Sequence, residues 1–121
     1  MIRERILRLV PNKTPTLDRL FNALADPTRR AVVERLGRGP AGVTELASPF
    51  AMALPSFTQH LGVLEACGLV RSEKHGRIRT YALEPGRLAE AEHWMVQQRR
   101  LWQSRLNQLD TLLLNQKENN S

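Results

Sequence analysis

The sequence predicts a mainly α-helical fold with one small β-hairpin, and two observations carry this prediction. Apolar residues recur at helical spacing through most of residues 15–114. Only residues 69–83 change to the β-branched and aromatic composition that strands favour. A chain of 121 residues has room for one hydrophobic core. We therefore expect one domain over 15–114, between an N-terminal extension, 1–14, and a polar tail, 115–121, that frays.

Two helices that begin at a proline are expected to open the domain. Thr14-Pro15 and Asp26-Pro27 each place an N-cap residue before proline, which is favoured at the first helical position. The first helix should run from about 15 to 25, with one apolar face made of Leu17, Leu20, Phe21 and Leu24. The second should bury Val32, Val33 and Leu36 and end in the glycine-rich stretch 37–40.

A short helix over Val43–Ala47 and a longer one over 54–66 are expected next. The longer helix has one inward stripe, made of Leu54, Phe57, Leu61 and Leu64, and Gly68 ends it. Its opposite face carries small or flat hydrogen-bonding side chains, namely Ser56, Thr58, Gln59 and His60. This polar face is either a solvated surface or a contact surface.

The positive charge is concentrated in two short segments. The formal net charge is +6, of which residues 1–13 carry +3 (four basic residues, one acidic) and residues 69–83 carry the other +3 (four basic, one acidic). The second segment is predicted to be a hairpin with a two-residue His75-Gly76 turn, because glycine adopts positive φ freely. A basic surface of this kind favours a polyanionic partner, most often a nucleic acid.

A long helix is expected over 86–114. Leu88, Met95, Trp102 and Leu109 are spaced by seven, and the flanking positions are also apolar: Trp94, Leu101, Leu106 and Leu113. This stripe is wider than a domain of this size needs for its own core. A second copy of the chain is the simplest partner for it, and a ligand pocket beside Trp94 and Trp102 is the alternative.

Several classes of protein are disfavoured. No apolar run approaches the length of a transmembrane helix, and the charged N-terminus does not resemble a signal peptide. A single cysteine, Cys67, favours a reducing cytoplasmic setting, and this thiol is expected to fill the core rather than act as a redox switch. No catalytic set of residues or glycine-rich phosphate loop is present, so we expect neither an enzyme nor a cofactor. The N-terminal extension could bind a membrane surface, but docking or disorder is favoured.

The predicted elements have the order of a winged helix-turn-helix. Three short helices come first, the helix over 54–66 follows them, and the basic hairpin comes last. A major groove of B-DNA admits one helix, and short polar side chains read its base edges. An adjacent hairpin can contact phosphates or a narrow minor groove. Arg29 and Arg30 either touch phosphate or are merely solvated.

Three stretches of the sequence resemble the ArsR family of bacterial repressors. They are the entry segment Leu20–Arg30 (LFNALADPTRR), the helix-turn-helix segments 43–47 and 58–70, and the hairpin residues Gly76-Arg77 and Tyr81–Leu83. The resemblance covers about residues 16–114. It implies a homodimeric winged-helix repressor in which the first and last helices form the dimer interface and helix 54–66 enters the major groove.

The sequence departs from the family pattern at the known metal-sensing positions. The third helix has no cysteine pair, and in the last helix Glu90, Glu92 and His93 are followed by no further histidine. We therefore expect the branch without these metal sites. Ala53 stands where the family usually has a serine cap, and Gly62 stands where it often has a lysine or arginine.

The expected function is repression of transcription by a cytoplasmic homodimer bound to a pseudo-palindromic operator in double-stranded DNA. The candidate DNA-binding residues lie in the 54–66 helix and the hairpin: Ser56, Thr58, Gln59, His60, Arg71, Lys74, His75, Arg77 and Arg79. The candidate dimer residues lie in the first and last helices: Leu17, Leu20, Phe21, Trp94, Leu101, Trp102, Leu109 and Leu113. The alternative is a winged-helix module that binds an acidic protein partner.

Overall fold

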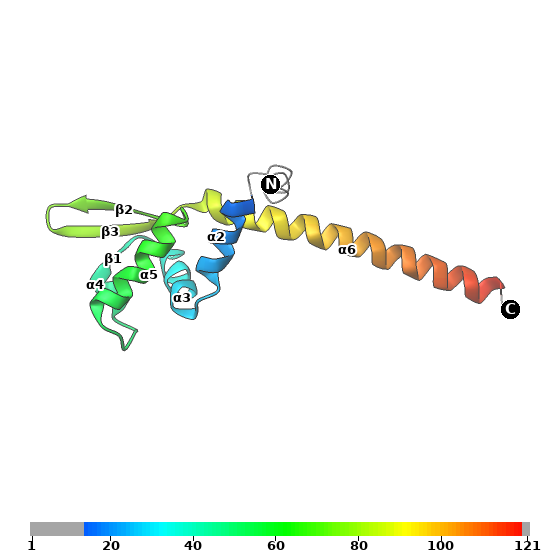
Figure 1. Ribbon diagram of the computed structural model, residues 1–121, viewed down its shortest axis with the longest axis horizontal. Helices are drawn as coiled ribbons and strands as arrows, with labels where there is room; N and C mark the ends of the chain where they lie inside the picture. The colour runs from blue at the N-terminus through cyan, green and yellow to red at the C-terminus, as the bar shows by residue number, and fades with distance from the viewer. Residues whose placement is uncertain (1–13, 120–121) are drawn as a thin grey trace, which may run out of the picture. The chain divides into compact units, whose positions relative to one another are not determined.

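A computed structural model describes residues 14–119 of the chain, and its elements follow the predicted order (Figure 1). They are α2 (Thr14–Leu24), α3 (Pro27–Leu36), β1 (Ala41–Gly42), α4 (Val43–Ala47), α5 (Leu54–Ala66), β2 (Val70–His75), β3 (Ile78–Leu83) and α6 (Pro85–Asn119). The predicted mainly α-helical class with a small sheet is confirmed. Predictions for residues 1–13 lie outside the described part of the chain.

The chain divides into two compact units, one up to Ala89 and one from Glu90 onwards. The first unit contains α2 to α5, the sheet and the first turn of α6. In this unit the closed end of the β2–β3 hairpin extends beyond helices α4 and α5 (Figure 1). The hairpin therefore presents its tip to solvent.

The sheet has three antiparallel strands in the order β1-β3-β2. The sequence did not predict β1, because a two-residue strand has no periodic pattern; it pairs Ala41 with Tyr81. The predicted His75-Gly76 turn is wrong by one residue, since His75 pairs with Ile78 and the turn residues are Gly76 and Arg77. Gly76 has φ +64, which fits the type II′ turn with glycine first.

The core of this unit is built mainly from α5 and the helices before it. Its largest fully buried side chains are Phe57, Leu20, Leu46, Leu61, Leu64, Leu69, Val32 and Val70. Phe50, in the segment before α5, stacks on Phe57 with ring centroids 5.5 Å apart. Leu54 was expected in the inward stripe, but it is 54% exposed because it lies in the first turn of α5, beyond the reach of the core. Val33, also expected inside, is partly exposed.

Gly68 ends α5 in a conformation that few other residues adopt. It has φ +81, its N–H donates to the carbonyl of Glu65, and the next N–H, of Leu69, donates to the carbonyl of Leu64. These two bonds form a Schellman motif, which favours glycine at this position. A Cβ at Gly68 would also lie 2.8 Å from Nε of Arg87.

The same substitution at two glycines is therefore expected to have opposite effects. Gly68→Ala should lower the free energy of unfolding by about 1–2 kcal/mol, because the left-handed conformation is unfavourable for alanine. Gly62→Ala, within α5, should raise it by about 1 kcal/mol, since a Cβ there meets no atom within 4 Å. Urea unfolding followed by circular dichroism at one protein concentration measures both; two changes of the same sign would contradict this description of α5.

The second unit consists of the remainder of α6. The helix was predicted over 86–114 with a frayed tail, but it continues to Asn119. The tail residues Gln116, Lys117 and Glu118 are good helix formers, and Lys117 lies in the last turn, where it complements the helix dipole. Within the described residues, no helix is long and apolar enough to cross a membrane.

Candidate nucleic-acid interface

Three of the four polar side chains predicted on α5 are exposed on one stretch of the helix. Ser56, Thr58 and Gln59 all face solvent. The hydroxyl of Thr58 donates to the carbonyl of Pro55 at 2.9 Å, which leaves its lone pairs to accept. The N-cap of α5 is Ala53, which makes no side-chain capping bond. This agrees with the sequence, in which Ala53 replaces the serine that usually caps this helix in the family.

His60 is more buried than these three residues and contacts the start of α3. Its side chain is 24% exposed and its Nδ1 lies 3.1 Å from Nη1 of Arg29 and 3.7 Å from Oδ2 of Asp26. Asp26 is the N-cap of α3 and accepts from the backbone N–H of Arg29. That hydrogen bond lowers the pKa of the Asp26 carboxyl, and the nearby His60 and Arg29 side chains lower it further, against partial burial. The charged carboxylate therefore stabilises the fold at neutral pH, and this contribution is lost as the pH falls through its folded pKa.

Arg29 and Arg30 both cap the C-terminal end of α2. Arg29 donates from Nε to the carbonyl of Ala23 at 2.8 Å and from Nη2 to that of Asn22 at 3.1 Å. Arg30 donates to the carbonyl of Leu24 at 2.9 Å. These carbonyls belong to the last turn of α2, where no further helical N–H follows, and that of Asn22 also accepts from the N–H of Ala25. The sequence left open whether Arg29 and Arg30 contact phosphate or are merely solvated, and the structure does not decide between these roles. It shows instead that both side chains stabilise the end of α2.

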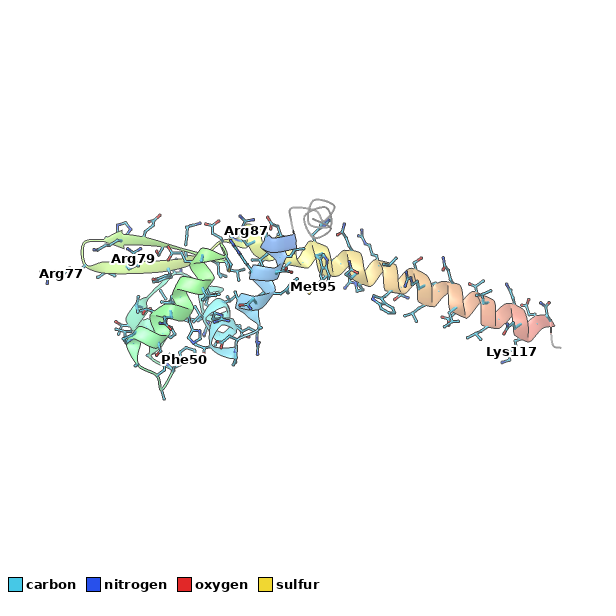
Figure 2. The ribbon with its side chains drawn as sticks, viewed as in Figure 1. Phe50, Arg77, Arg79, Arg87, Met95 and Lys117 are labelled. Carbon is cyan, nitrogen blue, oxygen red and sulfur yellow. The ribbon has the colours of Figure 1, made fainter. Side chains whose placement is uncertain are left out.

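The five basic residues predicted on the hairpin fall into two groups. Arg71 pairs with Glu84, which raises the pKa of the guanidinium, Arg79 donates to Ser72, and His75 lies 3.3 Å from Glu73. Lys74 and Arg77 are exposed and make no ion pair within residues 14–119. Arg77 stands at the tip of the hairpin and Arg79 lies further along it (Figure 2).

A chain of hydrogen bonds joins the hairpin to α5. Arg79 donates to the hydroxyl of Ser72 at 2.8 Å, and this hydroxyl donates to the carboxylate of Glu65, also at 2.8 Å. One residue from each strand is thus tied to the last turn of α5. Sequence reasoning missed Glu65 and Ser72, because nothing local to either residue indicates the partner. It treated Asp26 only as a helix cap.

The candidate dimer residues are placed unequally. Leu20 is fully buried in the first unit, so its assignment to an interface is wrong and it belongs to the protomer's own core. Leu17 and Phe21 are partly exposed. On α6, the candidates are all exposed, from 41% at Trp94 to 63% at Trp102: Trp94, Leu101, Trp102, Leu109 and Leu113.

The remaining candidate chemistry is sparse. Cys67 is buried and its thiol donates to the carbonyl of Leu64, as a core residue would. No group of three histidine, cysteine or acidic side chains able to hold a metal occurs between residues 14 and 119. The exposed polar helix face and the basic hairpin beside it define a winged helix-turn-helix of the DNA-binding class.

Comparison with known proteins agrees with this class and specifies it. Residues 24–73 match a family model described as a helix-turn-helix domain. The HTH-type transcriptional regulator Rv2034 of Mycobacterium tuberculosis is 49% identical over 72 residues, covering 60% of this chain and 67% of the relative. The transcriptional repressor SdpR of Bacillus subtilis is 28% identical over 80 residues, covering 66% of this chain and 89% of the relative.

A solved structure described as an ArsR family transcriptional regulator, RHA00566, superposes with a TM-score of 0.72. It is 53% identical and the match covers 74% of this chain and 93% of that chain. The chain belongs to the ArsR family and is a transcriptional regulator. The resemblance inferred from the sequence is thereby confirmed, as is the expectation that the protein is not an enzyme.

Proposed function

We propose that the protein acts as a homodimeric repressor that binds a pseudo-palindromic operator. Each protomer offers α5 to the major groove, where Ser56, Thr58 and Gln59 meet base edges, and offers the β2–β3 hairpin to the DNA backbone. The observation that carries this proposal is the exposed polar face of α5 beside a hairpin that presents two exposed cations, Lys74 on β2 and Arg77 at the tip (Figure 2). Neither makes an ion pair within residues 14–119. Repression would follow from blocking access of the polymerase to the operator.

The exposed apolar face of α6 supports the homodimer. Met95, Trp102 and Leu109 recur every seven residues and are 50–63% exposed. Leu106 and Leu113 lie beside them on the same side of the helix and are similarly exposed. A contiguous apolar face of this size is costly in water. A seven-residue repeat is the pattern by which one helix packs against an identical helix.

The hairpin contribution is tested by Lys74→Ala and Arg77→Ala. Each change should weaken binding to every duplex alike and flatten the slope of log K against log salt by roughly 0.9 for each phosphate that the variant no longer neutralises. Arg77 is a sharper probe than Arg79, because removal of Arg79 also breaks the hydrogen bonds through Ser72 to α5. Fluorescence anisotropy across a salt series measures both quantities.

Lys117→Ala is the matched control, since it removes the same charge from the second unit. It should leave the salt slope unchanged. If both hairpin variants keep the wild-type affinity and slope, the hairpin does not contact phosphate. If the wild-type protein shows no salt-dependent binding to any duplex, the repressor proposal fails and an acidic protein partner becomes the better account.

A further inference from the structure

Three side chains meet where α2 ends and α3 begins, beside the middle of α5. Asp26 caps α3, Arg29 lies in the first turn of α3, and His60 lies near the centre of α5. His60 directly follows Gln59, which is exposed. This cluster is therefore in contact with the part of α5 that the proposed function places in the groove.

Arg29 is the centre of this cluster. Two of its nitrogens are committed to the α2 carbonyls of Ala23 and Asn22, and the third, Nη1, reaches His60. A guanidinium is planar, so two fixed nitrogens determine the position of the third. The end of α2 thus sets the point at which Arg29 meets α5.

The chemistry of the contact fixes the imidazole. A guanidinium can only donate, so in the neutral ring Nδ1 of His60 is the acceptor in its 3.1 Å contact with Nη1. The Oδ2 of Asp26, 3.7 Å from the same Nδ1, faces a proton there only when the ring is charged. An accepting Nδ1 carries no hydrogen, which requires the hydrogen of the neutral ring to be on Nε2. The ring is held in one tautomer, with one nitrogen bound inside the protein and the other available only as a donor.

We infer that Arg29, anchored on the end of α2 through two of its nitrogens, is a positioning residue that fixes the rotation of α5 through His60 and so sets the base preference of the neighbouring Gln59. This inference rests on the proposed function, because it assigns Arg29 a part in sequence discrimination rather than in phosphate attraction. His60, a candidate DNA-contacting residue by its sequence position, then acts chiefly as the recipient of the Arg29 contact.

The tautomer is tested on the free protein, without DNA. Long-range proton–nitrogen correlation spectra at about pH 8, above the ordinary histidine pKa, should show His60 with a protonated Nε2 and an unprotonated Nδ1. His93, which is exposed, supplies an internal reference with both tautomers averaged. An Nδ1–H tautomer or an averaged pair of shifts at His60 would overturn the inference, whatever the protein does with DNA.

The positioning role is tested by Arg29→Lys, which keeps the charge but removes the planar fork. Affinity for the duplex that the wild-type protein enriches most from a random pool should fall about tenfold, as for loss of a charged hydrogen bond. Affinity for a scrambled duplex of the same length should stay within about twofold, and the salt slope should not change.

Arg30→Lys is the matched control. Arg30 also caps α2, through the carbonyl of Leu24, and among the described residues it has no hydrogen bond or ion pair with α5. It should leave both affinities unchanged.

Equal losses on both duplexes for Arg29→Lys would make Arg29 a phosphate contact, and no loss on either would make it a helix cap only; each result overturns the inference. In the double variant Arg29→Lys/His60→Ala, the loss should be no larger than that of the greater single change. A wild-type protein that enriches no duplex refutes the proposed function instead, while the tautomer test still decides on the contact.

Discussion

Replacing Trp102 and Leu109 together by glutamate is expected to convert the protein into a monomer and to abolish tight operator binding. Both side chains lie on the exposed apolar face of α6, 63% and 52% exposed in the isolated chain. Two carboxylates per protomer would face their own copies across the proposed interface, where like charges repel and lose water. Each protomer would then bind a half-site alone, and the loss of the linked second site should reduce affinity by on the order of 10²–10⁴-fold.

The matched control is Ser104→Glu with Thr111→Glu. These two positions have the same seven-residue spacing and the same added charge, but they lie on the opposite side of α6. Light scattering at micromolar concentration should give about 13.8 kDa for the first double variant and twice that mass for the control and the wild type. If the wild type itself scatters as a single chain, the homodimer is wrong; if both double variants dissociate, charge alone is responsible and the apolar face is not the interface.

Phe57→Ala is expected to have the largest effect on stability. Phe57 is fully buried in α5 and its ring stacks on Phe50, so alanine would leave a cavity under the segment that leads into the helix. Removal of a buried phenylalanine ring costs about 3–5 kcal/mol. Urea unfolding should be measured at one fixed protein concentration, because the stability of a dimer depends on concentration.

Leu54→Ala is the matched control for Phe57→Ala. Leu54 shares the sequence stripe of Phe57 but is more than half exposed. Its truncation should change the free energy of unfolding by no more than about 0.5 kcal/mol. Comparable losses at both positions would show that the stripe is buried throughout, as the sequence pattern alone predicts, and would contradict the structure of the first turn of α5.

Features determined by neighbouring residues could be predicted from the sequence. The proline and Asp26 at the start of α3 and Gly68 at the end of α5 each act through bonds within a few residues. The polar face of α5 follows from helical periodicity alone. For the same reason the family resemblance, carried by these same segments, indicated the class correctly.

Features determined by distant residues could not be predicted. His60 meets Arg29 across 31 positions, and Glu65 meets Ser72 only because the hairpin folds back on α5. The turn at Gly76 could be placed in either of two registers until the pairing of His75 with Ile78 selected one. Leu20 has the same apolar character as Leu17, and only the packing of the unit shows that Leu20 is the buried one.

Local charge was also an incomplete guide to the hairpin. Four positive side chains in residues 69–83 appear equivalent in the sequence. In the structure Arg71 is paired with Glu84 and Arg79 is bound to Ser72, whereas Lys74 and Arg77 have no such partner among residues 14–119. The candidate interface is therefore narrower than the charge count suggests, and it is centred on the hairpin tip and the exposed face of α5.

Selection of bound sequences from a pool of random duplex DNA tests the central claim most directly. A homodimer that reads DNA through two copies of α5 should enrich two inverted half-sites separated by one helical turn or a small multiple of it. Gln59→Ala should enrich a different base at one position of each half-site while keeping the spacing. Enrichment of a single unrepeated site, or no enrichment at all, would contradict the account of a dimer that reads DNA through α5.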